Sequence, residues 1–435
     1  MQIFGWFING VRMKKRISYK LLLISIIIGL CAGLIVSLFR LLIPKVMFVI
    51  SNLIIFGQKN LLNAIIFVFA FIFIGFLVSI CVNKEPMIGG SGIPQISGKL
   101  HDKLDYSALS CLINKIIGGL LAIGSGLTLG REGPSVQIGG SLGEVMANIF
   151  KLDDDDKKIM IIGSSASGIT SAFTAPISAI AFALEELMKK TSRINFIYIT
   201  STIISSSIVT SLIIGNDPVI KIKNHLNLSM RFWIYLIFLG ILVGFSSILF
   251  NKGILFGKKL YKNLPISQSI KSIIPFFITS IFLLFDSRLL GSGENFISLA
   301  QGDNYEISTL IYFYFMKLLL LLIAFCSGIP GGIFFPLLAM GSLIGNFYGC
   351  ILFELNLVGE NEIIIFSMLA MAAHFASIVR APLTGMFLII EMTGGRIDFF
   401  LPIIIVSLVA YLLTENFKNE PIYESLLEIM IKNKS

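Results

Sequence analysis

The sequence predicts an all-α, polytopic membrane protein. Of its 435 residues, 55% are hydrophobic and only 14% are charged, and the mean hydropathy is +0.89. A water-soluble protein of this length needs more charge to cover its surface. Apolar segments recur along the whole chain, and several approach or exceed the roughly 20 residues that a helix needs to span a bilayer. These segments are 21–49, 61–82, 107–129, 159–188, 194–214, 232–251, 272–290, 309–325, 332–353, 363–376, 382–392 and 398–413.

The first 20 residues are predicted to be a cytoplasmic segment. Basic residues precede the first apolar segment, and the positive-inside rule places such a segment in the cytoplasm. No cleavage pattern of a signal peptide follows. The net charge of +9 therefore indicates membrane orientation and contact with the lipid bilayer, and it gives no reason to expect nucleic acid. The basic residues are Arg12, Lys14, Lys15, Arg16 and Lys20.

Residues 21–414 are predicted to form one transport domain made of two related halves, roughly 21–214 and 232–414. The phrase "GREGPSVQIGGSLG" (130–143) is echoed by "GIPGGIFFPLLAMGSLIG" (328–345). About 40 residues further on in each half, "TAPISAIAFALEELM" is echoed by "RAPLTGMFLIIEMT". Glycine-rich breaks at corresponding places indicate an inverted-repeat transporter, in which interrupted helices point at a midplane site. The alternative is the general enrichment of small residues in membrane helices.

The first broken phrase is "GGSGIPQISG", residues 89–98. Gly90 and Gly92 allow the backbone to approach a ligand closely. Pro94 suits the first turn of a helix, where its missing N–H is no loss. Ser91 then lies just before a helix N-terminus, where free N–H groups attract anions and its hydroxyl adds one more donor.

Two further phrases repeat this design. In "GREGP", Arg131 and Glu132 precede Gly133 and Pro134 at an expected helix start. In "SGIPGGIFFP" (327–336), paired glycines precede a helix whose first amides would point at a ligand. Three such helix starts aimed at one point would bind a dehydrated anion without a full positive charge, and the anion could still be released. The residues of the third phrase are Gly331, Gly332, Ile333 and Phe334.

Glu132 is expected to compete with that anion. A carboxylate near mid-bilayer costs several kcal/mol unless it is compensated, so it indicates function. At the positive end of a helix the carboxylate can occupy the position of a free anion, and on protonation it loses that attraction. The alternative is that Glu132 only pairs with Arg131 or caps its helix.

Taken together, the three phrases resemble the signature motifs of the CLC family of chloride channels and chloride/proton antiporters. They occur in the family's order and spacing, and the similarity covers nearly the whole chain. The resemblance implies a CLC-type inverted-repeat fold with many tilted and broken helices. It also implies chloride and protons as transported ions, and a homodimer with one pathway in each subunit. The chain resembles the compact bacterial type without regulatory domains, which implies a bacterial plasma membrane.

The resemblance also assigns roles to single residues. Glu132 would be the external gating glutamate. Tyr423, in the C-terminal segment 415–435, would coordinate the anion, although the residues alone would make it an interfacial anchor. The implied chloride-binding residues are Ser91, Ile333, Phe334 and Tyr423.

Two further ionisable positions have competing interpretations. In "FALEELMKK" (182–190), the residues alone suggest that Glu185 and Glu186 are solvated helix-end groups. The resemblance instead matches Glu186 to the internal proton-transfer glutamate of the antiporters. It matches Lys115 to a buried lysine that shapes the field near the pore, and a snorkelling lysine is the alternative.

Antiport is favoured over a passive, voltage- or pH-gated channel, because channels of the family tend to lack the inner glutamate. The chain departs from many relatives at Gln95, Ser97 and His101, where acidic residues are common, and this thins the negative charge near the inner vestibule. Ser91 resembles the chloride-selective pattern. The preference among chloride, bromide and nitrate stays open, since backbone amides discriminate weakly between monovalent anions.

No cofactor, metal or enzymatic activity is expected. The five cysteines and three histidines show no metal-ligand spacing. "GGSLG" (139–143) formally fits the GxSxG motif of hydrolases, but that motif needs a strand-to-helix elbow and a histidine partner. Here the match falls inside an expected apolar helix, and His225 and His374 have no sequence relation to it.

Overall fold

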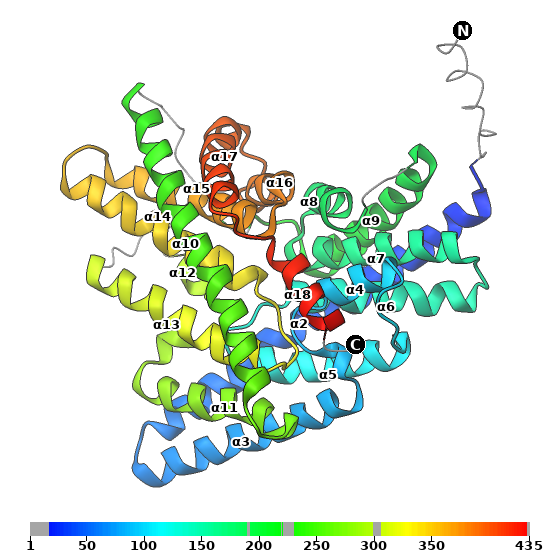
Figure 1. Cartoon of the computed structure of the whole chain (residues 1–435), viewed down its shortest axis with the longest axis horizontal. Helices are drawn as coiled ribbons and strands as arrows, with labels where there is room; N and C mark the ends of the chain where they lie inside the picture. The colour runs from blue at the N-terminus through cyan, green and yellow to red at the C-terminus, as the bar shows by residue number, and fades with distance from the viewer. Residues whose placement is uncertain (1–16, 189–191, 219, 221–229, 299–305, 433–435) are drawn as a thin grey trace.

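The computed structural model describes residues 17–188, 192–218, 220, 230–298 and 306–432, and they are almost entirely helical (Figure 1). Within this part of the chain, nine helices are long and apolar enough to cross a membrane, as the fold class predicted. Of the basic residues among the first 20 positions, only Lys20 lies in the described ranges, and it falls in the first turn of the first helix, which begins at Tyr19. His225 also lies outside them.

The first half of the chain runs from α2 to α9. Its longer elements are α2 (Tyr19–Gly57), α3 (Leu61–Lys84), α5 (Ala108–Gly124), α6 (Glu132–Ile149), α7 (Asp154–Phe173) and α9 (Arg193–Ile214). Its short elements are η1 (Pro86–Ile88), α4 (Ile93–Leu100), α8 (Pro176–Phe182) and η2 (Ala183–Leu187).

The second half runs from α10 to α17, and α18 follows it. Its longer elements are α10 (Met230–Asn263), α11 (Gln268–Phe285), α13 (Ile307–Cys326), α14 (Phe334–Glu354), α15 (Glu360–Val379) and α17 (Phe400–Asn416). Its shorter elements are η3 (Ser287–Leu289), α12 (Glu294–Ser298), α16 (Pro382–Met392) and η5 (Ile397–Phe399), and the chain continues into α18 (Ile422–Lys432).

The helices are tilted and broken rather than upright. With its 39 residues, α2 is about 58 Å long at 1.5 Å per residue, far more than the roughly 30 Å hydrocarbon core, so it must cross obliquely. The apolar segment 159–188 is not one helix. It breaks at Thr174, which has a left-handed φ of 60°, because Pro176 cannot continue the hydrogen-bond ladder of α7. Arg380 (φ 72°) makes the same break ahead of Pro382 in the second half.

Close glycine contacts build the core of each half. In the first half α6 packs on α7, and in the second half α14 packs on α15. A Cβ on Gly139 would collide with the carbonyl oxygen of Ser164, and a Cβ on Gly341 would lie 2.8 Å from that of Ala370. Small residues thus bring the backbones of the central helices together, as is usual in membrane bundles.

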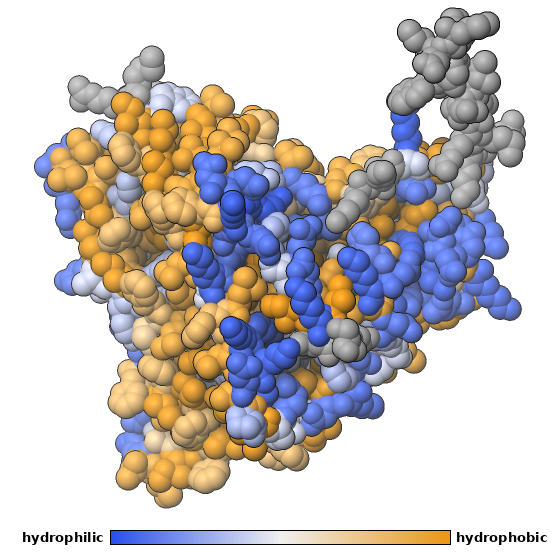
Figure 2. Space-filling model, in the orientation of Figure 1, coloured by the Kyte–Doolittle hydropathy of each residue, from blue (hydrophilic) through white to orange (hydrophobic). Residues whose placement is uncertain are grey.

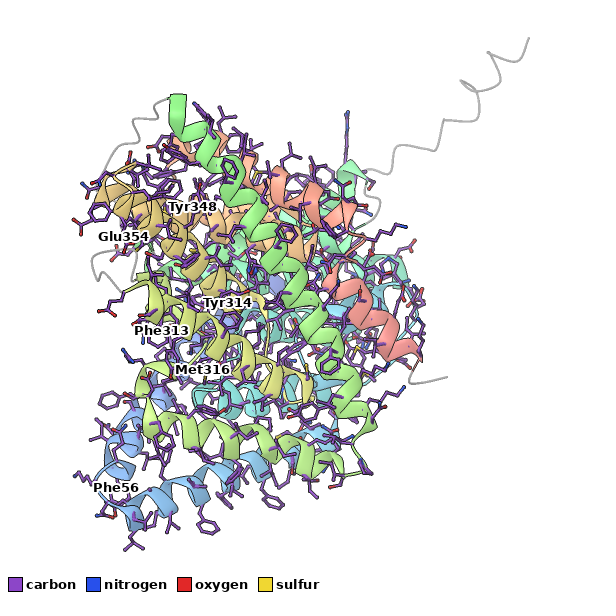
Figure 3. All side chains as sticks on the ribbon, turned by 60° about the vertical axis from the view of Figure 1, so that its left-hand side comes forward. Phe56, Phe313, Tyr314, Met316, Tyr348 and Glu354 are labelled. Carbon is purple, nitrogen blue, oxygen red and sulfur yellow. The ribbon has the colours of Figure 1, made fainter. Side chains whose placement is uncertain are left out.

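The surface divides into an apolar flank and a hydrophilic face. Apolar side chains cover the flank around α3, α10, α11 and α13 (Figure 2), and Tyr314 of α13 lies with Phe313 and Met316 on the side turned forward in Figure 3. Hydrophilic residues gather over α4, α18 and the ends of α6 and α7 (Figure 2). Lysines are frequent there, so the positive-inside rule makes it the cytoplasmic face. They include Lys99, Lys103, Lys151, Lys157 and Lys158.

Candidate functional site

Two short backbone bridges join the three glycine-rich phrases. Gly90 pairs with Pro330, and Gly130 pairs with Gly332. In the second bridge, each glycine donates its N–H to the carbonyl of the other at 2.7 Å. The N–H of Gly331 also donates to the carbonyl of Gly90 at 3.1 Å. The loops that start α4, α6 and α14 therefore meet at one place, although about 240 residues separate the first from the last.

The first loop presents Ser91. Gly90 and Gly92 have positive φ angles of 70° and 99°, which only glycine adopts readily, and α4 begins directly after Gly92 with Pro94 in its first turn. Ser91 is 2% exposed. It lies so close to Gly133 of the second loop that a Cβ there would collide with the Ser91 hydroxyl. Among the described residues, that hydroxyl has no hydrogen-bond partner.

Glu132 is the first residue of α6 and is fully buried. Within the described chain, neither carboxylate oxygen has a hydrogen-bond partner. The nearest cation is Arg131, whose Nε lies 3.9 Å from Oε1, but Nη1 of Arg131 lies closer, at 3.4 Å, to the carboxylate of Glu294. Arg131 is therefore shared between two carboxylates, and its contact with Glu132 is the longer of the two.

The third loop contributes backbone groups. Ile333 caps α14, Phe334 is its first residue, and both are fully buried. The first amides of a helix have no intrahelical acceptor. A Cβ on Gly331 would lie 2.6 Å from the Leu129 side chain, and one on Gly332 would lie 3.1 Å from the Gly130 carbonyl. Only glycines let this loop approach the loop of Glu132.

Tyr423 reaches the site from α18, which packs against α4. It is 3% exposed, and its hydroxyl has no hydrogen-bond partner in the described chain. Burial, and then the nearby carboxylate of Glu186, raise the pKa of Tyr423 well above its usual range. The phenol therefore stays protonated and can donate a hydrogen bond. Its placement contradicts the interpretation of Tyr423 as an interfacial anchor.

Lys115 does not snorkel. It is fully buried, and its ammonium donates to the carbonyls of Ile88 at 2.6 Å and Gly90 at 2.7 Å. It thus holds the loop that carries Ser91. Sequence reasoning missed its counterpart Lys317, which binds the carbonyls of Leu289 and Gly291 at 2.7 Å each. The signal was present, because "GSGEN" (291–295) echoes "GSGIP" (90–94).

The acidic pair at 185–186 separates into two environments. Glu185 accepts hydrogen bonds from the amides of Leu383 (2.9 Å) and Thr384 (2.8 Å) and from the Thr384 hydroxyl (2.7 Å), so it caps α16. In return, Glu391 of α16 accepts from the amides of Ile177 (2.9 Å) and Ser178 (2.8 Å) at the start of α8. The interpretation of Glu185 as a solvated helix-end group is wrong.

Glu186 borders a cavity of about 260 Å³ on the cytoplasmic side of Tyr423. It belongs to the π-helical turn η2, and such turns occur frequently at functional sites. The cavity is lined by Ser97, His101, Lys103, Glu185, Glu186, Val379, Arg380, Pro421, Tyr423, Glu424, Leu427, Glu428 and Ile431.

Within the described ranges, the serine and histidine of the hydrolase motif do not come together, and no cluster of metal ligands is present. Ser141 lies within α6 and is 1% exposed. Both ring nitrogens of His374 are hydrogen-bonded to groups other than Ser141: Nδ1 lies 2.7 Å from the carbonyl oxygen of Leu337, and Nε2 lies 3.1 Å from the hydroxyl of Ser246. The described residues contain no group of three or more His, Cys, Asp and Glu side chains that could hold a metal.

Comparisons with known proteins agree with this geometry. A family model described as voltage gated chloride channel matches residues 74–415. The H(+)/Cl(-) exchange transporter ClcA of Vibrio campbellii is 35% identical over 96% of this chain and 91% of its own length. The ClcA of Citrobacter koseri is 32% identical, over 97% and 91%. The similarity thus extends over nearly the full length of both chains.

Solved structures give the same result. A slow cyanobacterial Cl-/H+ antiporter superposes with a TM-score of 0.90 at 29% identity, covering 95% of this chain and 98% of that one. A eukaryotic CLC transporter shares the fold with a TM-score of 0.80 at 20% identity, covering 95% of this chain and 74% of that one.

Proposed function

The chain belongs to the voltage-gated chloride channel family, and on that premise we propose that it exchanges chloride for protons across a bacterial plasma membrane. One observation carries the proposal. A fully buried carboxylate, that of Glu132, lies where three helix starts meet, and the described chain gives its oxygens no hydrogen-bond partner. Such a group is stabilised by helix dipoles when charged and can be released when protonated.

Chloride would bind between Glu132 and the cytoplasmic side. The hydroxyls of Ser91 and Tyr423 are buried donors without partners in the described chain, and the first amides of α14 add the positive end of a helix. We assign chloride binding to Ser91, Tyr423, Ile333 and Phe334. Lys115 positions the Ser91 loop without contacting the anion.

Protons would travel by a second route that starts at Glu186. Glu185 is the other candidate, but both of its oxygens are held by the start of α16. Glu186 borders the same cavity as Tyr423, and Glu132 lies beyond Tyr423. We assign proton transfer to Glu186 on the inside and Glu132 on the outside. The passive channel is the second candidate, and nothing in the geometry favours it over exchange.

The test reads chloride and pH together in proteoliposomes. An imposed chloride gradient should drive protons uphill in the wild type. Glu132→Gln should abolish proton movement and leave chloride movement, because the amide can neither protonate nor act as an anion. Chloride movement without any proton movement in the wild type would establish the channel instead.

We further propose a homodimer in the lipid bilayer, with one pathway in each subunit and without an enzymatic step or a cofactor. Exposed apolar side chains of α16 and α17, such as Leu383 and Leu401, suit either lipid or a second copy. Light scattering in detergent should give a protein mass twice the 47.9 kDa of one chain.

A further inference from the structure

A second cavity reaches the anion site from a different face of α18 than the cavity that Glu186 borders. Its volume is about 120 Å³, and its walls are Gly90 and Ser91, the start of α4, Lys258 and Phe325, and three apolar residues of α18. One water occupies about 30 Å³ in the liquid, so this space can hold an anion together with water. It is therefore a candidate for the inner end of the anion path.

The walls of this second cavity carry a positive charge. Within the described chain, Lys258 is the only charged residue that lines it. Gln95, from the start of α4, is neutral, and its amide nitrogen donates to the carbonyls of Met87 at 3.1 Å and Gly89 at 2.6 Å. The α18 residues in the wall are apolar. The charge of the lysine is thus not offset by any other residue of this wall.

Lys258 is held beside the Ser91 loop. It lies near the cytoplasmic end of α10 and is partly buried. Its ammonium donates to the carbonyl of Phe325 at 3.0 Å and lies 4.8 Å from the centre of the Phe325 ring. That ring packs against the loop, because a Cβ on Gly90 would lie 3.5 Å from it. The carbonyl uses one of the three ammonium N–H groups, so the others remain available to an anion in the cavity.

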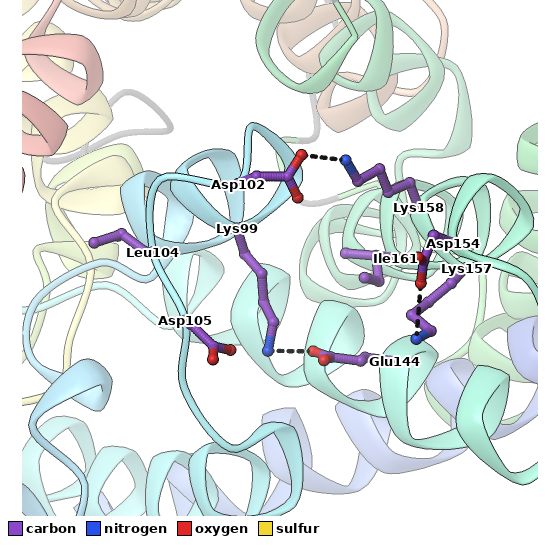
Figure 4. A pocket seen from close by; sticks show the side chains of 9 residues that line it. All are labelled: Lys99, Asp102, Leu104, Asp105, Glu144, Asp154, Lys157, Lys158 and Ile161. Carbon is purple, nitrogen blue, oxygen red and sulfur yellow. Dashed lines mark hydrogen bonds and ion pairs between the residues drawn. The ribbon is translucent and has the colours of Figure 1, made fainter.

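Lys258 also differs from neighbouring lysines of the cytoplasmic face. In a cavity of about 510 Å³ between α4, α6 and α7, Lys99 pairs with Glu144 and Lys158 pairs with Asp102, each at 2.6 Å (Figure 4). Over the part of the chain that the structure describes, no carboxylate forms such an ion pair with Lys258. A cation without a carboxylate partner attracts anions, and its field extends over about 10 Å at 0.1 M salt.

We propose that Lys258 draws chloride from the cytoplasm into this cavity, from which the anion passes to Ser91. The inference rests on the proposed transport of chloride, and it gives the anion an inner entry separate from the cavity of Glu186. The Phe325 carbonyl holds the ammonium beside the entry, so the lysine raises the local concentration of chloride without becoming a ligand of the central site. Chloride can then leave again, which a direct lysine ligand would hinder.

The experiment measures exchange of labelled chloride in proteoliposomes with equal chloride on both sides, so that the orientation of the protein does not matter. Lys258→Gln removes the charge but keeps a side-chain N–H for the Phe325 carbonyl. It should raise the chloride concentration for half-maximal exchange several-fold, with the ratio of proton to chloride flux unchanged. Lys258→Arg keeps the charge and should resemble the wild type. Lys259→Gln is the control, because it removes the same charge from an exposed position on the same helix.

Ionic strength separates attraction of the anion from a structural role. Added sodium gluconate should shrink the difference between the wild type and Lys258→Gln, because salt screens the lysine, whereas a structural defect would persist. An unchanged half-maximal concentration in Lys258→Gln, or an equal rise in Lys259→Gln, would overturn the entry. If the wild type moved chloride without protons, the exchange function would fail, and the shift in Lys258→Gln would still support the entry. Absence of any chloride exchange in the wild type would reject both.

Discussion

The two halves build the same scaffold and place different chemistry on it. Lys115 and Lys317 each donate to two carbonyls of a glycine-rich loop. Glu185, which follows α8, caps the start of α16, and Glu391 of α16 caps the start of α8. The charges at corresponding positions then diverge. The same contacts therefore hold the loops and helix starts in both halves, and function depends on the positions where the two halves differ.

The differences lie one residue away from the shared features. Glu185 is followed by Glu186, whereas Glu391 is followed by Met392. Ser91 precedes a helix that starts with Ile93 and Pro94, whereas Ser292 precedes Glu294, whose carboxylate pairs with Arg131. Among the described residues, the first half thus carries a second acid directly after its capping glutamate, and the second half carries an acid in its Gly-Ser-Gly loop instead.

The largest expected effect comes from removing the acid that the second half lacks. Glu186→Gln should abolish proton movement completely and leave chloride flux, because an amide cannot carry a proton between the cytoplasm and Glu132. Parallel measurement of chloride flux and pH checks this. Met392→Glu is the mirror control: it adds an acid at the corresponding position and should leave the proton-to-chloride ratio unchanged. Proton pumping that persists in Glu186→Gln would place the inner acid elsewhere.

Next in size are the lysine clamps. Lys317→Met should destabilise the protein by about 2 to 6 kcal/mol, because it leaves the carbonyls of Leu289 and Gly291 without their ammonium donor at about 1 to 3 kcal/mol apiece. Lys115→Met should cost about 1 to 3 kcal/mol, because the carbonyl of Gly90 keeps the N–H of Gly331 as a donor and, among the described residues, only the carbonyl of Ile88 loses its donor. Thermal unfolding in detergent measures the loss. Lys115→Met should also weaken chloride binding measured by calorimetry, because its loop carries Ser91. Equal chloride affinity in both variants would contradict the division between scaffold and site.

The reciprocal caps should give a smaller effect. Glu185→Gln and Glu391→Gln keep one carbonyl oxygen but lose the charge at a helix N-terminus, an effect of about 0.5 to 2 kcal/mol. Glu185 accepts from three donors and Glu391 from two. We therefore expect the larger drop in unfolding temperature for Glu185→Gln. A larger drop for Glu391→Gln would show that contacts other than the caps determine how much these two glutamates stabilise the protein.

Much of this arrangement could be predicted from the sequence because the informative signals are local. Short motifs identify the site residues Gly90, Ser91, Glu132 and Gly331, and hydropathy identifies the membrane helices. The caps could not be predicted, since Glu185 and the amide of Thr384 are about 200 residues apart and nothing local pairs them. The burial of Lys115 could not be predicted either, because the carbonyls that it binds lie about 25 residues away in the sequence. Local composition does not distinguish such a lysine from one that snorkels to the membrane surface.

The smallest expected effect concerns Glu294, which breaks the symmetry on the outer side. Its side chain is 46% exposed and its carboxylate lies 3.4 Å from Nη1 of Arg131. Exposed pairs contribute less than about 1 kcal/mol, so Glu294→Gln should leave the unfolding temperature nearly unchanged. It should instead free the arginine to attract anions, raising chloride flux at low external chloride, with a gain that disappears as ionic strength rises. Glu306→Gln, another external-loop carboxylate that has no ion pair with Arg131 among the described residues, is the control. An equal gain in chloride flux in both variants would show that the change in overall surface charge, and not the release of Arg131, causes it.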